Sequence, residues 1–377
     1  MLASPRPRRP GPGEIAELHA WLDDGLRDGE RGRLAAEYPL TMGAGGSRGH
    51  FAVYSETGRP VAHAMGHGFV ASVGRRSLPL GMIGNVYTEP THRGRGLASA
   101  CVEASVEELR RAGAGAAMLW TDQHDWYRRM GFLPAGREWI WQLPPGFGSA
   151  EPGFGSAEPG FGSAKPGFGS LDGMRGEVRL AEDADMEPLD RLYDARTVRV
   201  HRPWSALRRF CAAPHTTVAV AECHGQVRAY VAAGRGSDLA GVVHEWGGDP
   251  AMAARCIQWL QRHGKAHAVL SGPPVEGLGK VLADLGAEPT DGIFALVRIL
   301  DAQRLWHCMT PSDTRVSFRD EGATLRFCSP EGEQSLSQEE ALDLFFNRGA
   351  DVLRDSLRHR LDDVLPWPLY VWGFDSI

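Results

Sequence analysis

Apolar and polar positions between residues 82 and 132 change period in a way that predicts a strand, a helix and a second strand. Residues 82–88 are apolar and β-prone, and Pro90 ends this stretch because proline cannot continue a strand ladder. The next apolar positions recur at helical spacing as far as Gly113, which is placed to end a helix. Residues 116–121 then predict a short buried strand. The helical positions are Ala98, Val102, Ser105, Leu109 and Ala112.

The loop between the first strand and the helix is rich in arginine and glycine. It reads NVYTEPTHRGRGLA over residues 85–98 and contains Arg93, Gly94, Arg95, Gly96 and Leu97. Backbone N–H groups at a helix N-terminus attract anions, glycine allows close approach of the backbone, and arginine matches phosphate oxygens. The loop therefore predicts a diphosphate site. The alternative is an ordinary strand–loop–helix crossover with a basic cap.

A second motif, WYRRMGF, follows at residues 126–132. With the R-x-x-G-x-A loop it resembles the GNAT superfamily of acetyl-CoA-dependent N-acetyltransferases, which carry both signatures in this order. The resemblance implies that residues 93–97 hold the diphosphate of acetyl-CoA, while backbone groups of Val86 and Thr88 pair with its pantetheine arm. It implies that free amides of the same strand stabilise the oxyanion and that Tyr127 protonates the departing thiolate. The alternative for Tyr127 is a core aromatic beside Phe132.

Repeats of PGFGSAE divide the chain between Pro145 and Ser170. Proline and glycine in every unit exclude a helix, so we expect a flexible, extended linker over residues 145–174. The phenylalanines of the repeats are either binding points or parts of a plain spacer, and we favour the spacer. The expected organisation is a disordered tail (1–12), a catalytic domain (13–144), the linker, a second domain (175–300) and a small third unit (301–377).

Residues 175–300 repeat the order of elements expected in the first domain. The counterpart of the arginine–glycine loop reads WGGDP over residues 246–250; it lacks arginine, and Asp249 would repel a diphosphate. No second aromatic–tyrosine motif follows. We therefore predict a degenerate, non-catalytic repeat that packs on the first domain or shapes its cleft. The expected fold class is α/β (α+β), with tandem GNAT-like mixed sheets flanked by helices.

Residues 301–377 predict a small α+β unit, with a hairpin around residues 320–322 and a capping box at Ser337. The whole layout resembles the enhanced-intracellular-survival type of aminoglycoside acetyltransferase, whose last unit is similar to a sterol carrier protein. In that family the terminal carboxylate of the chain enters the first cleft and accepts the amine proton, which implies this role for Ile377. The apolar tail over residues 365–377 fits a docked end. Members of that group assemble, so a homo-oligomer stays open.

Acetyl transfer needs a base, because an alkylamine with a pKa of about 10.4 is mostly charged at neutral pH. Besides Ile377, the candidates are Glu37 and three residues just before Tyr127, namely Asp122, His124 and Asp125. The leading interpretation is acetyl transfer from acetyl-CoA to a small-molecule or peptide amine. One alternative is a non-catalytic protein that senses acyl-CoA. Another is an acyltransferase similar to those that make mycothiol.

The composition of the chain excludes several other classes of protein. A net charge of −6 gives no reason to expect a nucleic-acid partner. The six cysteines are scattered without a C-x-x-C pair, so neither a disulfide framework nor a metal site is expected. The chain has no apolar run of about eighteen residues, and its proline-rich start lacks the apolar centre of a secretory signal. We therefore expect a cytoplasmic protein that does not act at a membrane.

Overall fold

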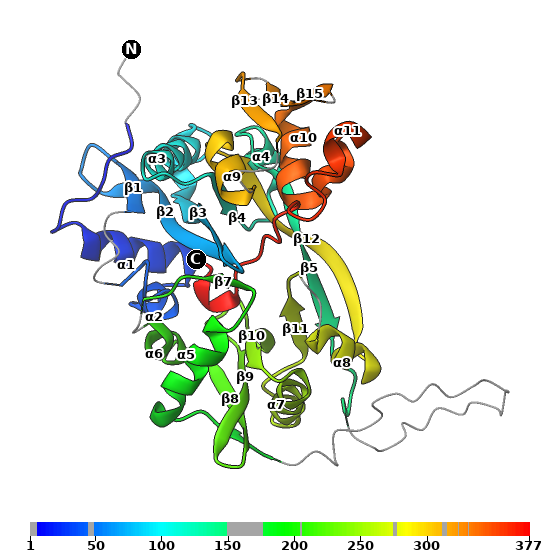
Figure 1. The fold of residues 1–377 in the computed structure, drawn as a ribbon. Helices are drawn as coiled ribbons and strands as arrows, with labels where there is room; N and C mark the ends of the chain where they lie inside the picture. The colour runs from blue at the N-terminus through cyan, green and yellow to red at the C-terminus, as the bar shows by residue number, and fades with distance from the viewer. Residues whose placement is uncertain are drawn as a thin grey trace, which may run out of the picture.

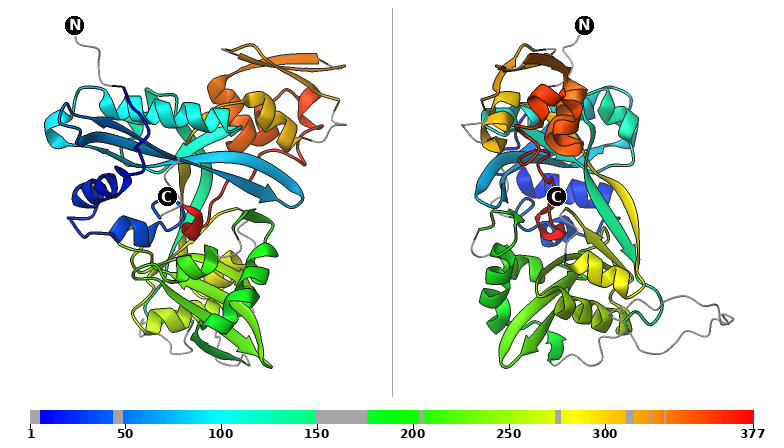
Figure 2. Two further views of the ribbon diagram at one scale, coloured as in Figure 1. Left: turned by 90° about the vertical axis from the view of Figure 1, so that its left-hand side faces the viewer. Right: turned by 45° about the vertical axis from the view of Figure 1, so that its right-hand side comes forward.

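A computed structural model describes residues 6–43, 49–148, 176–203, 206–273, 277–310, 315–322, 324–330 and 332–377, without the side chain of Ser356. Two halves, each a sheet covered by helices, are stacked on one another, and a small third unit lies beside the first half (Figure 1, Figure 2). The end of the chain lies between the two halves in all three views. This arrangement confirms the predicted mixed α/β class.

The first half contains α1 (Ile15–Leu26), α2 (Arg33–Glu37), β1 (His50–Tyr54), β2 (Pro60–Val73), β3 (Arg76–Thr88), α3 (Leu97–Arg111), β4 (Ala116–Leu119), α4 (His124–Arg128) and β5 (Leu133–Gln142). The second half contains β6 (Glu177–Leu180), α5 (Met186–Asp194), β7 (Val198–Val200), α6 (Ala206–Cys211), β8 (Thr217–Cys223), β9 (Gln226–Ala233), β10 (Val242–Gly248), α7 (Pro250–Arg262), β11 (Ala268–Ser271), α8 (Leu278–Asp284) and β12 (Glu288–Ile299). The third unit contains α9 (Ala302–Met309), β13 (Ser317–Asp320), β14 (Thr324–Ser329), β15 (Gly332–Ser337), α10 (Gln338–Leu342) and α11 (Asp355–Arg358).

A single sheet runs through both halves, because two long strands cross between them. Its order is β1-β2-β3-β4-β12-β5-β11-β10-β9-β8-β6. Strand β12 inserts between β4 and β5, while the far end of β5 inserts between β12 and β11. The two crossing strands pair antiparallel from Glu288 and Gln142 to Val297 and Leu133. The expected boundary at residue 144 therefore does not separate two sheets, since each half is completed by a strand of the other.

One helix covers the sheet at equivalent places in the two halves. In the first half, α3 buries Cys101, Val102, Val106 and Leu109 against the strands. In the second half, α7 buries Cys256, Ile257 and Leu260 in the same manner. Both helices show the apolar stripe that the 3.6-residue period predicts.

The segments before and after the first half are more ordered than the predicted disordered tail and flexible spacer. Residues 6–12 were expected to be disordered, yet Arg8 exchanges two backbone hydrogen bonds with Ala52 at 2.9 Å, and its guanidinium pairs with Glu14. Phe147, in the first PGFGSAE unit, is buried in the core of the second half. It therefore serves as a packing residue rather than as part of a spacer. Residues 1–5 and the later repeats lie outside the described residues.

The third unit has one strand more than the predicted hairpin, in the order β13-β14-β15. The capping box is present, because Ser337 Oγ accepts from the Glu340 N–H at 3.2 Å and the Glu340 carboxylate accepts from the Ser337 N–H at 2.8 Å. From this unit the chain returns along an apolar path to the junction of the halves (Figure 2). The buried side chains on that path are Leu365, Trp367, Leu369, Tyr370, Val371, Trp372 and Phe374.

Candidate active site

Helix α3 begins with an open N-terminus at the edge of the first half. Gly94 and Gly96 have φ angles of +75° and +74°, and Gly96 is the N-cap residue without any side-chain cap. A methyl group built on either glycine would meet nothing within 4 Å, so glycine is required there by backbone conformation rather than by space. The first N–H groups of a 15-residue helix therefore face outward, as an anion site requires.

A large cavity extends from this helix along the gap between β3 and β4. The two strands are parallel and pair only from Leu80 with Ala116 to Met82 with Met118. Beyond these pairs β4 ends at Leu119, while β3 continues to Thr88 and leaves backbone groups on that side without a neighbouring strand. The cavity has a volume of about 1000 Å³ and is lined by residues 83–88, by the arginine–glycine loop and by residues 120–123.

Tyr127, on α4, lines the same cavity. Its side chain is only 7% exposed and packs edge-on against Trp126 and Phe132, with ring centroids 4.5 and 5.9 Å away. Burial raises the pKa of Tyr127 to about 12. The phenol is therefore protonated at neutral pH, and its hydroxyl is available as a proton donor.

The C-terminal residue Ile377 enters this cavity from the other side. A methyl group built on Gly84 of β3 would lie 3.1 Å from the Ile377 oxygen and 3.2 Å from its carboxyl carbon. The terminal carboxylate therefore lies against the backbone of β3, at a glycine whose missing side chain leaves room for it. Ile377 and Tyr127 both line this cavity, together with β3.

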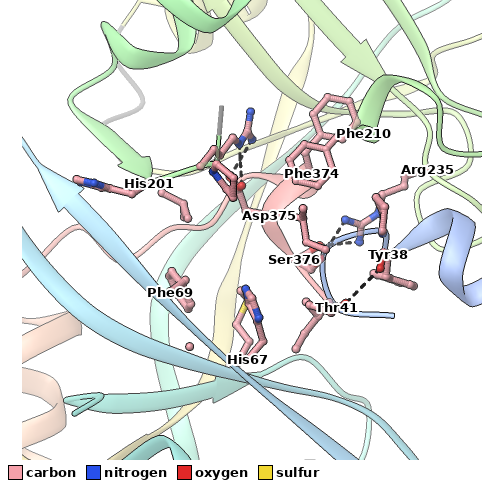
Figure 3. Close-up of a pocket in the computed structure, with 18 residues that line it drawn as sticks. Tyr38, Thr41, His67, Phe69, His201, Phe210, Arg235, Phe374, Asp375 and Ser376 are labelled. Atoms are coloured by element: carbon pink, nitrogen blue, oxygen red, sulfur yellow. Dashed lines mark hydrogen bonds and ion pairs between the residues drawn. The ribbon is translucent and has the colours of Figure 1, made fainter. Parts of the chain in front are cut away.

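Arg235, from the second half, fixes the chain end. Its guanidinium donates to the Ser376 carbonyl at 3.0 Å, to Ser376 Oγ at 2.8 Å and to the Gly373 carbonyl, as Figure 3 shows beside the ring of Tyr38. Arg235 is 4% exposed. Bonds from a buried charged donor to two carbonyls hold a terminal segment more firmly than neutral hydrogen bonds would.

A buried ion cluster holds the preceding turn. Arg202 donates to both oxygens of Asp375 at 2.7 and 2.8 Å and to the carboxylate of Glu245, and the Tyr193 hydroxyl donates to Asp375 at 2.9 Å. Glu245 also accepts from the Tyr230 hydroxyl at 2.8 Å. Removing one member of such a group would leave a buried charge without its partner, which costs about 3–5 kcal/mol. The second half therefore anchors the residues that place Ile377.

Residues 38–135 match the family model of the acetyltransferase (GNAT) domain. The chain carries a GNAT domain. The matched residues include β3, the arginine–glycine loop, α3 and Tyr127, so most of the lining of the cavity described above belongs to the GNAT domain, while Leu26, Asp238 and Ile377 come from outside the matched range.

Solved structures share the fold along most of the chain. A protein of unknown function from Enterococcus faecalis V583, described as a probable N-acyltransferase, is 14% identical over 100% of both chains, with a TM-score of 0.69. A GCN5-related N-acetyltransferase from Kribbella flavida is 16% identical over 99% of this chain and 98% of its own, with a TM-score of 0.64. Eis1 from Mycobacterium abscessus is 16% identical over 88% and 85%, with a TM-score of 0.55. Identities this low establish the fold alone. The sequence matches no curated protein.

Most residues expected at the acetyl-CoA site of the GNAT domain line the one cavity. Arg95 does not line it; its guanidinium turns back to the Thr91 carbonyl at 3.2 Å. Arg93 lines the cavity and donates to the Thr88 carbonyl at 3.2 Å. The expected residues that line the cavity are Val86, Thr88, Arg93, Gly94, Gly96, Leu97, Tyr127 and Ile377.

The alternative bases differ in their access to the GNAT cavity. Glu37 is 1% exposed and is held by Arg27 at 2.6 Å and by Arg33 at 2.5 Å, so it is already paired. His124 and Asp125 are exposed and do not line the cavity. Asp122 does line it. Of the five candidates, Asp122 and Ile377 therefore face the reacting space.

A second cavity of about 420 Å³ adjoins the first and shares Trp120, Asp238 and Ile377 with it. Glu138 of β5 also lines this second cavity, and burial raises the pKa of its carboxyl group to about 7. The remaining walls are largely apolar and include Phe294 and Tyr370. None of Glu138, Asp238 or Arg235 carries a local motif, and two of them come from the second half, so sequence reasoning missed them.

Among the described residues, no three His, Cys, Asp or Glu side chains lie close enough together to hold a metal ion. Within the same part of the chain, every helix is too short or too polar to span a bilayer.

Proposed function

We propose that the protein transfers an acetyl group from acetyl-CoA to an amine, with Ile377 as the base and Tyr127 as the acid. The observation that carries this proposal is the contact of the terminal carboxyl group with Gly84, inside the GNAT cavity that Tyr127 also lines. A carboxylate and a protonated phenol in one cavity supply the proton acceptor and the proton donor that aminolysis of a thioester needs.

The roles of the chain in this reaction follow from where its groups lie. The N–H groups at the start of α3 and the guanidinium of Arg93 bind the diphosphate, and unpaired backbone groups of β3 hold the pantetheine arm. The Ile377 carboxylate takes a proton from the ammonium group, and the freed amine attacks the thioester carbonyl carbon. A free amide of β3 stabilises the oxyanion. Collapse of the tetrahedral species breaks the C–S bond, and Tyr127 donates its proton to the sulfur.

The products of this sequence are an N-acetylated amine and coenzyme A as its thiol. The acetylated nitrogen still carries one surplus proton, which it passes through water to the Tyr127 phenolate formed in this step. The Ile377 carboxylic acid releases its proton to the solvent, so both residues are restored and one proton is released for each ammonium group acetylated.

The second cavity is suited to the acceptor. It opens to the Ile377 carboxylate and contains the carboxyl group of Glu138 between aromatic walls. Asp238 and Arg235 also line it, but Asp238 already accepts from Arg27 at 2.7 Å and Arg235 is engaged by the chain end. Carboxylates and aromatic faces both attract ammonium groups. These features favour a cationic amine over a neutral or acidic acceptor.

The test compares two changes at the chain end. Addition of one glycine after Ile377 moves the terminal carboxylate by about 3.5 Å along the chain and keeps every side chain. We expect kcat for thiol release with an amine panel to fall by about 100-fold or more, as for loss of a general base. The control Ile377→Val keeps the carboxylate and should lose less than about threefold, since only one methyl group is removed.

Tyr127→Phe should lower kcat by a similar factor while leaving acetyl-CoA affinity, measured by calorimetry, within about twofold. Full activity in the glycine-extended chain would exclude Ile377 as the base. Tight acetyl-CoA binding without thiol release from any amine would instead favour the acyl-CoA-sensing alternative.

A further inference from the structure

The second half contains a cavity at the place that corresponds to the acetyl-CoA cavity of the first half. Strands β10 and β11 are parallel and pair only at Val242 with Ala268 and Val243 with Val269. Beyond these pairs lies a cavity of about 280 Å³, lined by residues at the ends of both strands and at the start of α8. In the first half, the ends of β3 and β4 and helix α4 provide the equivalent walls.

This second-half cavity cannot accept a diphosphate in the same way. The N-terminus of α7 is closed by Asp249, whose carboxylate accepts from the N–H groups of Ala251 and Met252, both at 2.9 Å. A fixed negative charge thus occupies the position that a phosphate would take. Any ligand of this cavity must be recognised by other groups.

Those groups are supplied by Arg196, which lines the cavity between two tryptophans. Its Cζ atom lies 3.5 Å from the ring centroid of Trp372 and 4.9 Å from that of Trp246. Stacking of this kind uses the faces of the guanidinium and leaves its N–H groups directed outward in the plane. The Arg196 guanidinium is therefore held in a fixed orientation.

The N–H donors at this point lack acceptors. Arg196 Nε, Arg196 Nη1 and Trp246 Nε1 are all buried, and none has a hydrogen-bond partner among the described residues. Burial lowers the pKa of Arg196, and the nearby carboxylate of Glu245 is already engaged by Arg202 and Tyr230. Three buried donors without acceptors, on two residues that line one cavity, indicate that an acceptor group from outside the chain belongs there.

We propose that the second half binds a small apolar carboxylate in this cavity, with its two oxygens on Arg196 and Trp246. A carboxylate only accepts hydrogen bonds, so one of its oxygens can accept from Arg196 and the other from Trp246. The body of the ligand would lie against Leu192, Val198 and Leu278, which line the same cavity. The volume, just below the range of drug-sized sites, suits a molecule with one ring or a short branched chain.

The site has a direct connection to the chain end. Trp372, which stacks on Arg196, lies five residues before Ile377, and its indole N–H donates to the Val198 carbonyl at 3.1 Å. Binding to this cavity does not depend on the proposed acetyl transfer. It can therefore be tested whether or not the protein is an active acetyltransferase.

The experiment is calorimetric titration of the full chain with phenylacetate and, separately, with its neutral amide phenylacetamide. We expect one phenylacetate to bind per chain, at least tenfold tighter than phenylacetamide, with no displacement by saturating acetyl-CoA. Arg196→Gln should weaken phenylacetate binding by at least tenfold. The matched control is Arg191→Gln, because Arg191 is exposed on α5, the helix that ends just before Arg196, and pairs with Glu187; it should change the affinity by less than twofold.

A second variant keeps the proposal testable if Arg196→Gln fails to fold, as judged by circular dichroism. Ala195→Phe leaves Arg196 in place and puts a ring at the rim of the cavity, where Ala195 is exposed. It should also weaken binding at least tenfold. No binding of phenylacetate, equal binding of the amide, competition by acetyl-CoA, or unchanged affinity in either variant would overturn the proposal.

Discussion

The two halves begin their equivalent helices in opposite ways. Helix α3 starts at Gly96, with a left-handed backbone and no side-chain cap, and its N–H groups face a cavity of about 1000 Å³. Helix α7 starts at Asp249, whose carboxylate occupies the corresponding N–H groups. The N-cap residue therefore decides whether the first N–H groups of the helix are free to meet an anion, while the surrounding strands stay parallel and divergent in both halves.

The arginines that line the two cavities, Arg93 in the first half and Arg196 in the second, also differ in their exposure and surroundings. Arg93 is exposed at the open mouth of its cavity, as suits a group that meets a large soluble anion. Arg196 is stacked between two aromatic rings at a smaller cavity. The second half has thus lost the features of a diphosphate site but not its cavity.

The largest effect is expected from separating the two halves, which tests whether each half can fold without the other. A fragment of residues 1–148 lacks β12 and would expose the edges of β4 and β5. We expect it to be insoluble or unfolded, because unpaired central strands aggregate and each half lacks a strand of its sheet. Solubility and circular dichroism of the purified fragment measure this.

The control for that experiment cuts the chain without removing a strand. Co-expression of residues 1–160 with 161–377 retains β12 and should give a soluble complex that co-purifies and melts in one transition. A folded, monomeric 1–148 fragment would instead show that the halves are independent domains.

The next prediction transfers the closed helix start into the first half. Gly96→Asp should lower the affinity for acetyl-CoA by about 100-fold, since a carboxylate at the N-cap both occupies the N–H groups and repels phosphate. Gly96→Asn is the matched control, because asparagine has the same shape and also tolerates a positive φ. We expect it to lose less than about tenfold by calorimetry. Equal losses in both would mean that backbone strain, not charge, decides binding.

Some of this comparison could be predicted from the sequence, because its signals are local. The arginine–glycine loop, the helix that follows it and the WGGDP counterpart are contiguous segments, and each lies where its motif predicted. Ile377 was expected only through a family resemblance, and the apolar tail supported it. The structure places that residue in the cavity, whereas its role as a base is still a prediction.

The rest depends on long-range pairing, which leaves no local signal. The apolar run in β12 predicts a buried strand, but it does not indicate whether that strand pairs with strands of its own half or of the other half. In the sequence, Glu138 looks like an ordinary polar residue of a strand and Arg235 like an ordinary loop arginine. Only the folded structure shows that Glu138 lines a cavity with Ile377 and that Arg235 donates to Ser376. The ordered structure of residues 6–12 was not predicted for the same reason, since Arg8 is hydrogen-bonded to Ala52, which is distant in sequence.

Strand β5 belongs to both halves, and its Glu138 allows the shared region to be probed by pH. Burial raises the pKa of this carboxyl group from 4.5 to about 7, so the native state binds its proton more tightly than the unfolded state. Its contribution to stability is therefore lost as the pH rises between these values. Glu138→Gln should stabilise the protein at pH 8 by up to about 3 kcal/mol and have little effect at pH 4.

The measurement is the melting temperature of Glu138→Gln and wild type at both pH values. Glu288→Gln, at an exposed position on the neighbouring strand β12, is the control and should shift neither. A stabilisation that is equal at pH 4 and pH 8 would show that charge burial is not its cause. If Glu138 also binds the acceptor, the same variant should raise KM for cationic amines.

The smallest effect is expected from opening the second helix. Asp249→Ala removes both side-chain hydrogen bonds to the start of α7 and should destabilise the protein by about 1 kcal/mol, the usual value of an N-cap. Asp249→Ser keeps a capping oxygen and should restore most of that stability in thermal melts. Neither variant should gain acetyl-CoA binding at the second half, because its loop has no arginine and its cavity of about 280 Å³ is too small for the whole molecule. A second molar equivalent of bound acetyl-CoA in Asp249→Ala would mean that the cap alone had closed that site.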